Sequence, residues 1–213
     1  MTNLTLALLG LALLVAVGDW FGVATGRDRW VYVCKPAVMA VLIAATLTLP
    51  DLPTPLRVLV IGGQLAGLAG DVALMLGKFL PGAGAFGVGH VLYILAWLPY
   101  TRPGVGAAVG VVAMLVVMAT AGRAVTLATA QRSLTMSRVV AFYQVLLAVM
   151  VVAACATEVW LLAGAAALFA ASDTLLGWTR FVHEAPRARV VVHVTYHLAQ
   201  IGIVAALPLL TVP

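Results

Sequence analysis

Apolar residues form long continuous runs along most of this chain, without the alternation of a half-buried strand. Each run holds roughly 20 residues, the length that crosses the hydrocarbon core of a bilayer as a helix. Proline, glycine and arginine interrupt the runs and divide the chain into about eight of them. The predicted transmembrane helices cover residues 3–25, 31–49, 56–77, 84–101, 104–122, 137–154, 158–179 and 190–210.

Short connections join these runs, for example residues 50–55 and 101–104, so consecutive helices are expected to be antiparallel neighbours in one bundle. The composition agrees, because 64% hydrophobic and 9% charged residues leave too little polar surface for a water-soluble globule. The first run lacks a basic start and a cleavage site, which favours a retained helix over a signal peptide. The sequence therefore predicts an all-α, multi-pass integral membrane protein with residues 1–213 as a single transmembrane domain.

The formal charge of +5 comes mainly from arginines between the predicted helices. The second, fourth and sixth connections offer only Arg57 and Arg102, so the positive-inside rule places the odd connections in the cytoplasm and both termini outside. A bacterial cytoplasmic membrane is the expected location, and the charge needs no nucleic-acid partner to explain it. The odd connections carry Arg27, Arg29, Lys78, Arg123, Arg132, Arg138, Arg180, Arg187 and Arg189.

Polar side chains gather in the half of the bundle nearest these basic connections. All lie within about two helical turns of an odd connection, and ionisable groups inside a membrane normally face an interior cavity. We therefore expect a polar pocket toward the cytoplasmic leaflet, although Asp19 could equally be an interfacial group near a helix end. The set consists of Asp19, Lys35, Asp71, His90, Tyr143, Asp173, His193, Tyr196, His197 and Gln200.

The last predicted helix carries a polar stripe, because His193, Tyr196, His197 and Gln200 share one helical face. Histidines one turn apart could bind a metal together with an aspartate, but no HExxH or CxxC pattern supports this. Hydrogen-bonded imidazoles are the preferred interpretation. The sequence therefore predicts no metal and no cofactor.

Asp71 is expected at a tight helix crossing, since Gln64 and Gly67 share its face and neighbouring glycines let another backbone approach. Lys35 could hold an anionic headgroup or form a structural ion pair with an aspartate. Pro36 is read as a first-turn proline of the second helix.

An internal duplication is a further hypothesis. An offset of about 102 residues aligns Asp71 with Asp173 and His90 with His193, and would make residues 1–103 and 104–213 two parallel four-helix repeats. The paired aspartates and histidines would then face one another, with His90 close to both aspartates in one pocket.

The residues together resemble the YhhN-like lysoplasmalogenase family across the second to eighth predicted helices. Lys35-Pro36, Gly70-Asp71 and Ser172-Asp173 accompany the resemblance, as do Tyr196 and Gln200. Its central motif is Phe79-x2-Gly82-x3-Phe86-x3-His90-x2-Tyr93.

This resemblance implies an eight-helix membrane enzyme that hydrolyses the vinyl ether bond of lysoplasmalogens to a fatty aldehyde and a glycerophospho-alcohol. The reaction needs an acid for the alkene β-carbon, stabilisation of an oxocarbenium ion, and a base for water. We expect Asp71 as acid, Asp173 as base and His90 as the group that orients one of them. The expected substrate-binding residues are Lys35, Tyr93, Tyr143, His193, Tyr196, His197 and Gln200.

Two other functions fit the same residues. Intramembrane aspartate and histidine chains also form proton relays, so a proton-coupled carrier of a small amphiphile is the main alternative. A non-catalytic lipid-binding protein is the third. The expected partners are a lysophospholipid substrate and membrane lipids.

Overall fold

The structure is a computed structural model that describes residues 1–210. Within that range the chain is helical and has no strand, so the predicted all-α fold is confirmed. Residues 211–213 of the predicted domain lie outside the described residues. The α-helices are α1 (Asn3–Ala24), α2 (Asp28–Leu47), α3 (Thr54–Met75), α4 (Phe79–Trp97), α5 (Val105–Val117), α6 (Arg123–Ala130), α7 (Leu134–Ala156), α8 (Trp160–Phe181) and α9 (Ala188–Ala206).

Counted over residues 1–210, eight helical segments are long and apolar enough to cross a membrane, with α5 and α6 forming one of them as Val105–Ala130. Large apolar side chains such as Leu14, Val112 and Phe142 are exposed on the outside of the bundle. Lipid tails accommodate such a surface, whereas water would not. The buried Lys35 and Asp71 lie inside instead, as expected for an integral multi-pass membrane protein.

The fifth span is longer than the sequence predicted. It was expected to end at residue 122, but the chain passes through a π-helical turn, Met118–Gly122, and continues as α6 to Ala130. Arg123 therefore begins α6 instead of lying in the connection. A π turn leaves a carbonyl without its usual partner, and here Gln144 Nε2 donates to the Gly122 carbonyl at 3.2 Å. No proline or further glycine follows to end the helix.

The second span begins earlier than predicted, at Asp28 in place of residue 31. Pro36 is therefore an interior proline and not a first-turn one, and the expectation of a first-turn position was wrong. Because proline has no N–H, the carbonyl of Tyr32 one turn earlier loses its usual helical donor. Lys35 stands directly beside this interruption.

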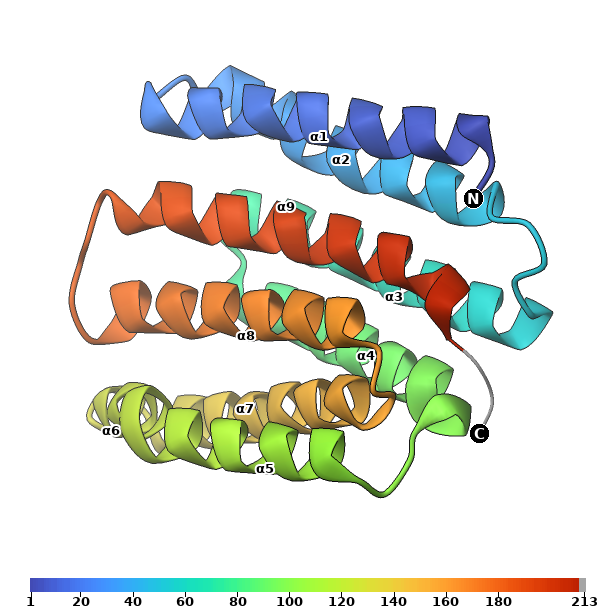
Figure 1. The fold of residues 1–213 in the computed structure, drawn as a ribbon. Coiled ribbons are helices and arrows are strands. Elements are labelled where there is room, and N and C mark those ends of the chain that lie inside the picture. The colour runs from blue at the N-terminus through green and yellow to red at the C-terminus, as the bar shows by residue number, and fades with distance from the viewer. Residues whose placement is uncertain (211–213) are drawn as a thin grey trace.

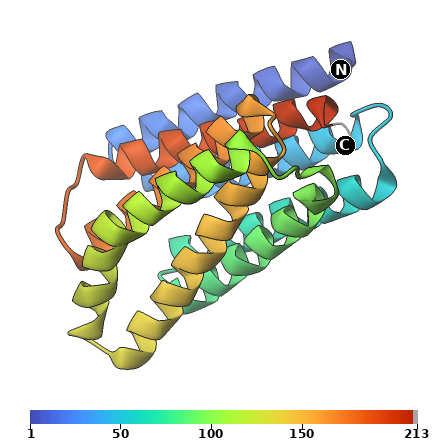
Figure 2. The same cartoon turned by 60° about the horizontal axis from the view of Figure 1, so that its bottom comes forward.

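Helices that follow one another in sequence pack closely in the bundle, as α1 with α2, α3 with α4 and α8 with α9 (Figure 1). From one side to the other the figure shows α1 and α2, then α9 and α3, then α8 and α4, and finally α7 with α5 and α6. The start of α1 and the finish of α9 lie at the same end, with the arginine-rich connections at the other. Figure 2 shows the turn between α6 and α7 standing apart from α3 and α4 at that arginine-rich end. Its assignment to the cytoplasm stays a prediction.

Glycines on α3 let aromatic side chains press against its backbone. A Cβ on Gly63 would lie 2.7 Å from Cε1 of Tyr93, and one on Gly70 would lie 2.7 Å from Cδ2 of Phe86. Gly67 faces Gln200 and the Tyr196 hydroxyl of α9. The tight crossing expected around Asp71 is therefore present, and it brings α4 and α9 against α3.

Gly106→Ala is expected to destabilise the fold by about 1–3 kcal/mol through overpacking. A Cβ at this position of α5 would collide with the backbone carbonyl of Cys155 on α7, which cannot move aside as a side chain can. Unfolding in mixed micelles measures the effect. Gly84→Ala is the matched control, because a Cβ there meets no atom of the described chain within 4 Å. Equal stability of the two variants would contradict the close α5–α7 contact.

Candidate functional site

Asp173 of α8, Tyr143 of α7 and His90 of α4 form a first group, here called the Asp173 cluster. The Tyr143 hydroxyl donates a hydrogen bond to Asp173 Oδ2. His90 Nε2 lies 2.9 Å from the same hydroxyl and 3.6 Å from Asp173 Oδ2. Three helices that are distant in sequence therefore bring their polar side chains to one carboxylate.

One assignment of the protons makes this cluster a continuous hydrogen-bond chain. The hydroxyl hydrogen of Tyr143 points to Asp173, so the hydrogen between Tyr143 and His90 belongs to Nε2 of the imidazole. Nδ1 of His90 has no hydrogen-bond partner among residues 1–210. The result is a chain of donors running from His90 through Tyr143 to Asp173, which can supply or withdraw a proton at the carboxylate.

Asp71 of α3, Lys35 of α2 and Tyr196 of α9 form a second group, the Asp71 cluster. Lys35 Nζ lies 2.9 Å from Asp71 Oδ1, and the Tyr196 hydroxyl donates to Oδ2 at 2.7 Å. The Asp71 side chain is 0% exposed. One oxygen is thus ion-paired to a cation and the other accepts a hydrogen bond, which is the environment of an ionised carboxylate. The ion pair considered as an alternative for Lys35 is present.

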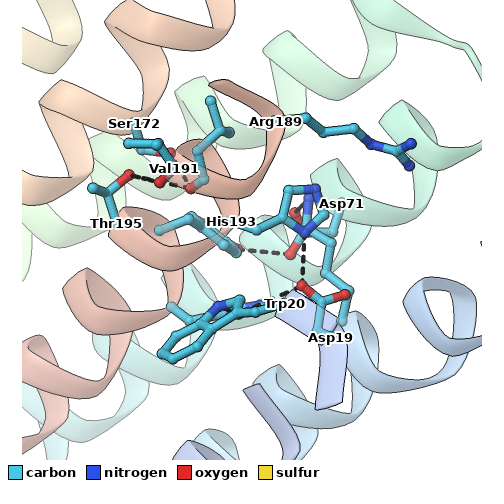
Figure 3. Close-up of polar contacts among 12 residues, drawn as sticks. Asp19, Trp20, Asp71, Ser172, Arg189, Val191, His193 and Thr195 are labelled. Carbon is cyan, nitrogen blue, oxygen red and sulfur yellow. Dashed lines mark hydrogen bonds and ion pairs between the residues drawn. The ribbon is translucent and has the colours of Figure 1, made fainter. Parts of the chain in front are cut away.

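A third group joins α1 to α9. His193 Nδ1 lies 2.7 Å from Asp19 Oδ2, and Figure 3 shows the two side chains pointing toward one another. Trp20 donates its indole N–H to Nδ1 of His197 at 3.1 Å, and that nitrogen also lies 3.7 Å from Asp19 Oδ2. Both histidines of the α9 stripe are therefore held by consecutive residues of the first helix.

Aromatic rings separate the Asp173 cluster from the Asp71 cluster. The Phe169 ring lies 5.1 Å from that of His90 and 5.5 Å from that of Tyr196, centroid to centroid. Phe86 packs against Phe169 and Tyr196 as well. The Tyr93 hydroxyl donates to Gln200 Oε1 at 2.9 Å, which links α4 to α9 deeper in the bundle.

The expectation that His90 faces both aspartates is thus met only for Asp173. Within the described residues, the polar partners of Asp71 are Lys35 and Tyr196, and two phenylalanines fill the space toward His90. The predicted duplication stays a prediction. Its matched residues do differ in their contacts, since Tyr196 binds Asp71 whereas its counterpart Tyr93 binds Gln200 and not Asp173.

A large cavity opens at the arginine-rich end of the bundle. It measures about 870 Å³, and we call it the basic vestibule. Lys35 and His193 line it, together with Arg132, Arg180 and Arg189 from the connections and helix ends around it. A vestibule of this charge fits an anionic group such as a phosphate.

An apolar cleft of about 70 Å³ adjoins this vestibule between α4, α5, α7 and α8. Asp173 and Tyr143 lie in its wall, as do Met118 and Gly122 of the π-helical turn. A shallow apolar groove between α4 and α7 adjoins the cleft and shares Tyr143 with it. Cleft and vestibule share four lining side chains, here called the junction: Leu74, Phe79, Leu176 and Phe181.

The sequence placed Asp19 among the polar residues of the expected pocket but indicated no catalytic or binding role for it, and it gave no indication of Trp20. Asp19 is 0% exposed, so it is not the interfacial group considered as an alternative. The available signal was an aspartate in an otherwise apolar run, but its position near a helix end fitted both interpretations. Phe86 belongs to the central motif, but the motif did not indicate that its ring separates the two clusters, and Phe169 gave no signal because phenylalanine is ordinary in a transmembrane helix. Residues 1–210 contain no group of three or more His, Cys, Asp or Glu side chains arranged to hold a metal ion.

The fold and the site define a multi-pass membrane protein whose interior carries acid–base clusters beside a basic vestibule and an apolar cleft. The YhhN family model matches residues 30–207, and the chain belongs to the YhhN family. Searches of curated proteins and of solved structures found no match. Asp71, His90, Asp173 and His193 lie inside the matched range, whereas Asp19 lies outside it.

Proposed function

We propose that this protein hydrolyses the vinyl ether bond of lysoplasmalogens, releasing a fatty aldehyde and a glycerophospho-alcohol. The observation that carries the proposal is the position of the basic vestibule beside an apolar cleft that shares four lining side chains with it and has Asp173 in its wall. A lysophospholipid has the same order of chemistry, with a charged head, a reactive ether and one hydrocarbon tail. Membership of the YhhN family supports the same function.

Each part of the substrate is assigned to the cavity whose polarity it matches. Its phosphate binds in the vestibule, where Arg180 and Arg189 lie near Lys35. Its tail runs from the junction along the cleft into the groove between α4 and α7, which opens toward the lipid. The vinyl ether, at the boundary between head and tail, then lies near the junction, with the β-carbon on the side of the cleft.

Asp173 is the acid of the proposed reaction. It transfers a proton to the β-carbon, the electron pair of the double bond forms the new C–H bond, and the positive charge spreads over the α-carbon and the ether oxygen. The donor chain from His90 through Tyr143 orients this carboxyl group. Such a transfer contributes roughly 10²–10⁴-fold to the rate.

Asp71 stabilises the oxocarbenium ion as a fixed negative charge. This reverses the division of roles expected from the sequence, in which Asp71 was the acid. Its contact with the Lys35 ammonium favours the ionised form, and Asp173 is the aspartate in the wall of the cleft that receives the tail. A charge held in place before the reaction costs no reorganisation when the cation forms.

Incubation of the purified protein with a lysoplasmalogen tests the proposal, with free aldehyde as the measured product. We expect aldehyde release by the wild type and none from the saturated alkyl-ether analogue, which has the same head and tail but no double bond to protonate. Folded wild-type protein that releases no aldehyde above a detergent blank would contradict the proposal. If it instead moved the lipid across a vesicle membrane in response to a pH gradient, the carrier alternative would replace the hydrolase.

A further inference from the structure

The proposed reaction needs a base to activate water, and neither aspartate of the two clusters suits that role. Asp71 has one oxygen engaged by Lys35 and the other by Tyr196. Asp173 is the acid, and after it has given its proton to the β-carbon it lies on the cleft side of the reacting bond, away from the vestibule. The group that takes a proton from water at the α-carbon should instead face the vestibule.

We propose that His193 is this base and that Asp19 is its positioning residue. The inference rests on the proposed function and deepens it. His193 Nδ1 lies 2.7 Å from the fully buried Asp19 carboxylate, while the side chain lines the basic vestibule. With Nδ1–H donated to Asp19, Nε2 keeps its lone pair and has no partner among the described residues. The Asp19 carboxylate thus orients the His193 imidazole, whose free nitrogen faces the open vestibule, as in a general-base dyad.

Neighbouring contacts fix the dyad from several sides. Ser172 Oγ donates to the carbonyl of Val192 at 2.9 Å, which ties α9 to α8 directly before His193 (Figure 3). Trp20 holds His197 one turn further along, so α1 is anchored to α9 at two consecutive residues. The charged or titratable groups around His193 are Asp19 from α1, Lys35 from α2, Asp71 from α3 and His197 from α9 itself.

His193 and Asp173 together account for every proton in the addition of water and the release of the glycerol. A water oxygen bonds to the α-carbon of the oxocarbenium ion, and one water proton passes to His193 Nε2, leaving a neutral hemiacetal. The protonated His193 then gives this proton to the glycerol oxygen as its bond to the α-carbon breaks. The hemiacetal hydroxyl proton returns to Asp173, and the carbonyl of the aldehyde forms. Both residues end in their starting states, and one water is consumed.

The first experiment follows kcat for aldehyde release against pH. In the wild type, kcat falls on the acid side as the base protonates. His193→Ala is expected to lower kcat by about 10²-fold and to remove the acid-side fall. Added imidazole, for which the vestibule has room, should restore part of kcat in His193→Ala. Asp19→Asn is expected to lower kcat without changing KM, and imidazole should not restore it.

Two matched variants serve as controls: His183→Gln in the exposed connection between α8 and α9, and Asp51→Asn in the connection between α2 and α3 at the opposite end of the bundle. Both should keep the wild-type profile. A His193→Ala variant that keeps the acid-side fall, or that fails to respond to imidazole while folded, would overturn the assignment of the base.

A second experiment tests the dyad without the proposed substrate. Diethyl pyrocarbonate acylates unprotonated, accessible imidazole nitrogens, and mass spectrometry locates the adduct. We expect His193 to react faster than the more deeply buried His90 and His197, and Asp19→Asn to slow its reaction. Reaction of His193 no faster than that of His90 and His197 would overturn the dyad whatever the substrate is. A reactive His193 in a wild type that releases no aldehyde would instead leave the dyad in place and remove the proposed function.

Discussion

Asp173→Asn should lower kcat for aldehyde release by about 10²–10⁴-fold while the protein stays folded. Asparagine keeps a carbonyl oxygen that can accept from the Tyr143 hydroxyl, so the contact between α7 and α8 survives. Its amide cannot transfer a proton to carbon. The loss is therefore expected in kcat and not in KM, measured by aldehyde release over a range of lysoplasmalogen concentrations.

Asp51→Asn provides the matched control, because it makes the same chemical change on the surface at the far end of the bundle. Tyr143→Phe should give a smaller loss, since it removes the hydroxyl between His90 and Asp173 but leaves the carboxyl group. If folded Asp173→Asn turned over substrate at the wild-type rate, another group would be the acid. The catalytic centre would then not lie at the apolar cleft.

The second large effect concerns stability. Lys35→Met removes the cation from a carboxylate whose side chain is 0% exposed, and it should destabilise the fold by about 3–5 kcal/mol. Replacing both partners, as in Lys35→Met with Asp71→Leu, should recover much of this loss, because no unpaired charge then remains inside. The free energy of unfolding in mixed micelles measures both variants.

Measured aldehyde release distinguishes the effect of the Lys35–Asp71 pair on stability from its effect on catalysis. The stable double variant should release no aldehyde above background, since it lacks the charge that stabilises the oxocarbenium ion. Lys78→Met is the matched control, because this lysine is exposed before α4 and its removal should change the free energy of unfolding little. A double variant no more stable than Lys35→Met would show that the cost does not come from an unpaired Asp71.

Much of the fold could be predicted because a bilayer imposes one simple rule, that about 20 apolar residues make one crossing. The same rule placed the polar residues at a common depth, since each was near a basic connection. It could not show that the chain crosses Gly122 as a π-helical turn, because that depends on Gln144 of another helix supplying a hydrogen bond. Pro36 was misplaced for a related reason, since α2 begins a full turn before the apolar run.

The candidate site could be predicted as a set of residues but not as an arrangement. Asp173 and His90 were expected together and lie together, because both lie at the depth of the basic connections. Their separation from Asp71 depends on how the Phe86 and Phe169 rings fill the interior, which helical spacing does not determine. The pairing of Asp19 with His193 needs α1 beside α9, a contact between the two ends of the chain that local sequence cannot indicate.

The junction of Leu74, Phe79, Leu176 and Phe181 gives the two products of the proposed reaction separate exits. The fatty aldehyde is released on the side of the cleft and partitions into lipid, while the glycerophospho-alcohol is released on the side of the vestibule and dissolves in water. Once the two fragments are in different phases they no longer meet at the site. Product inhibition should therefore be weak.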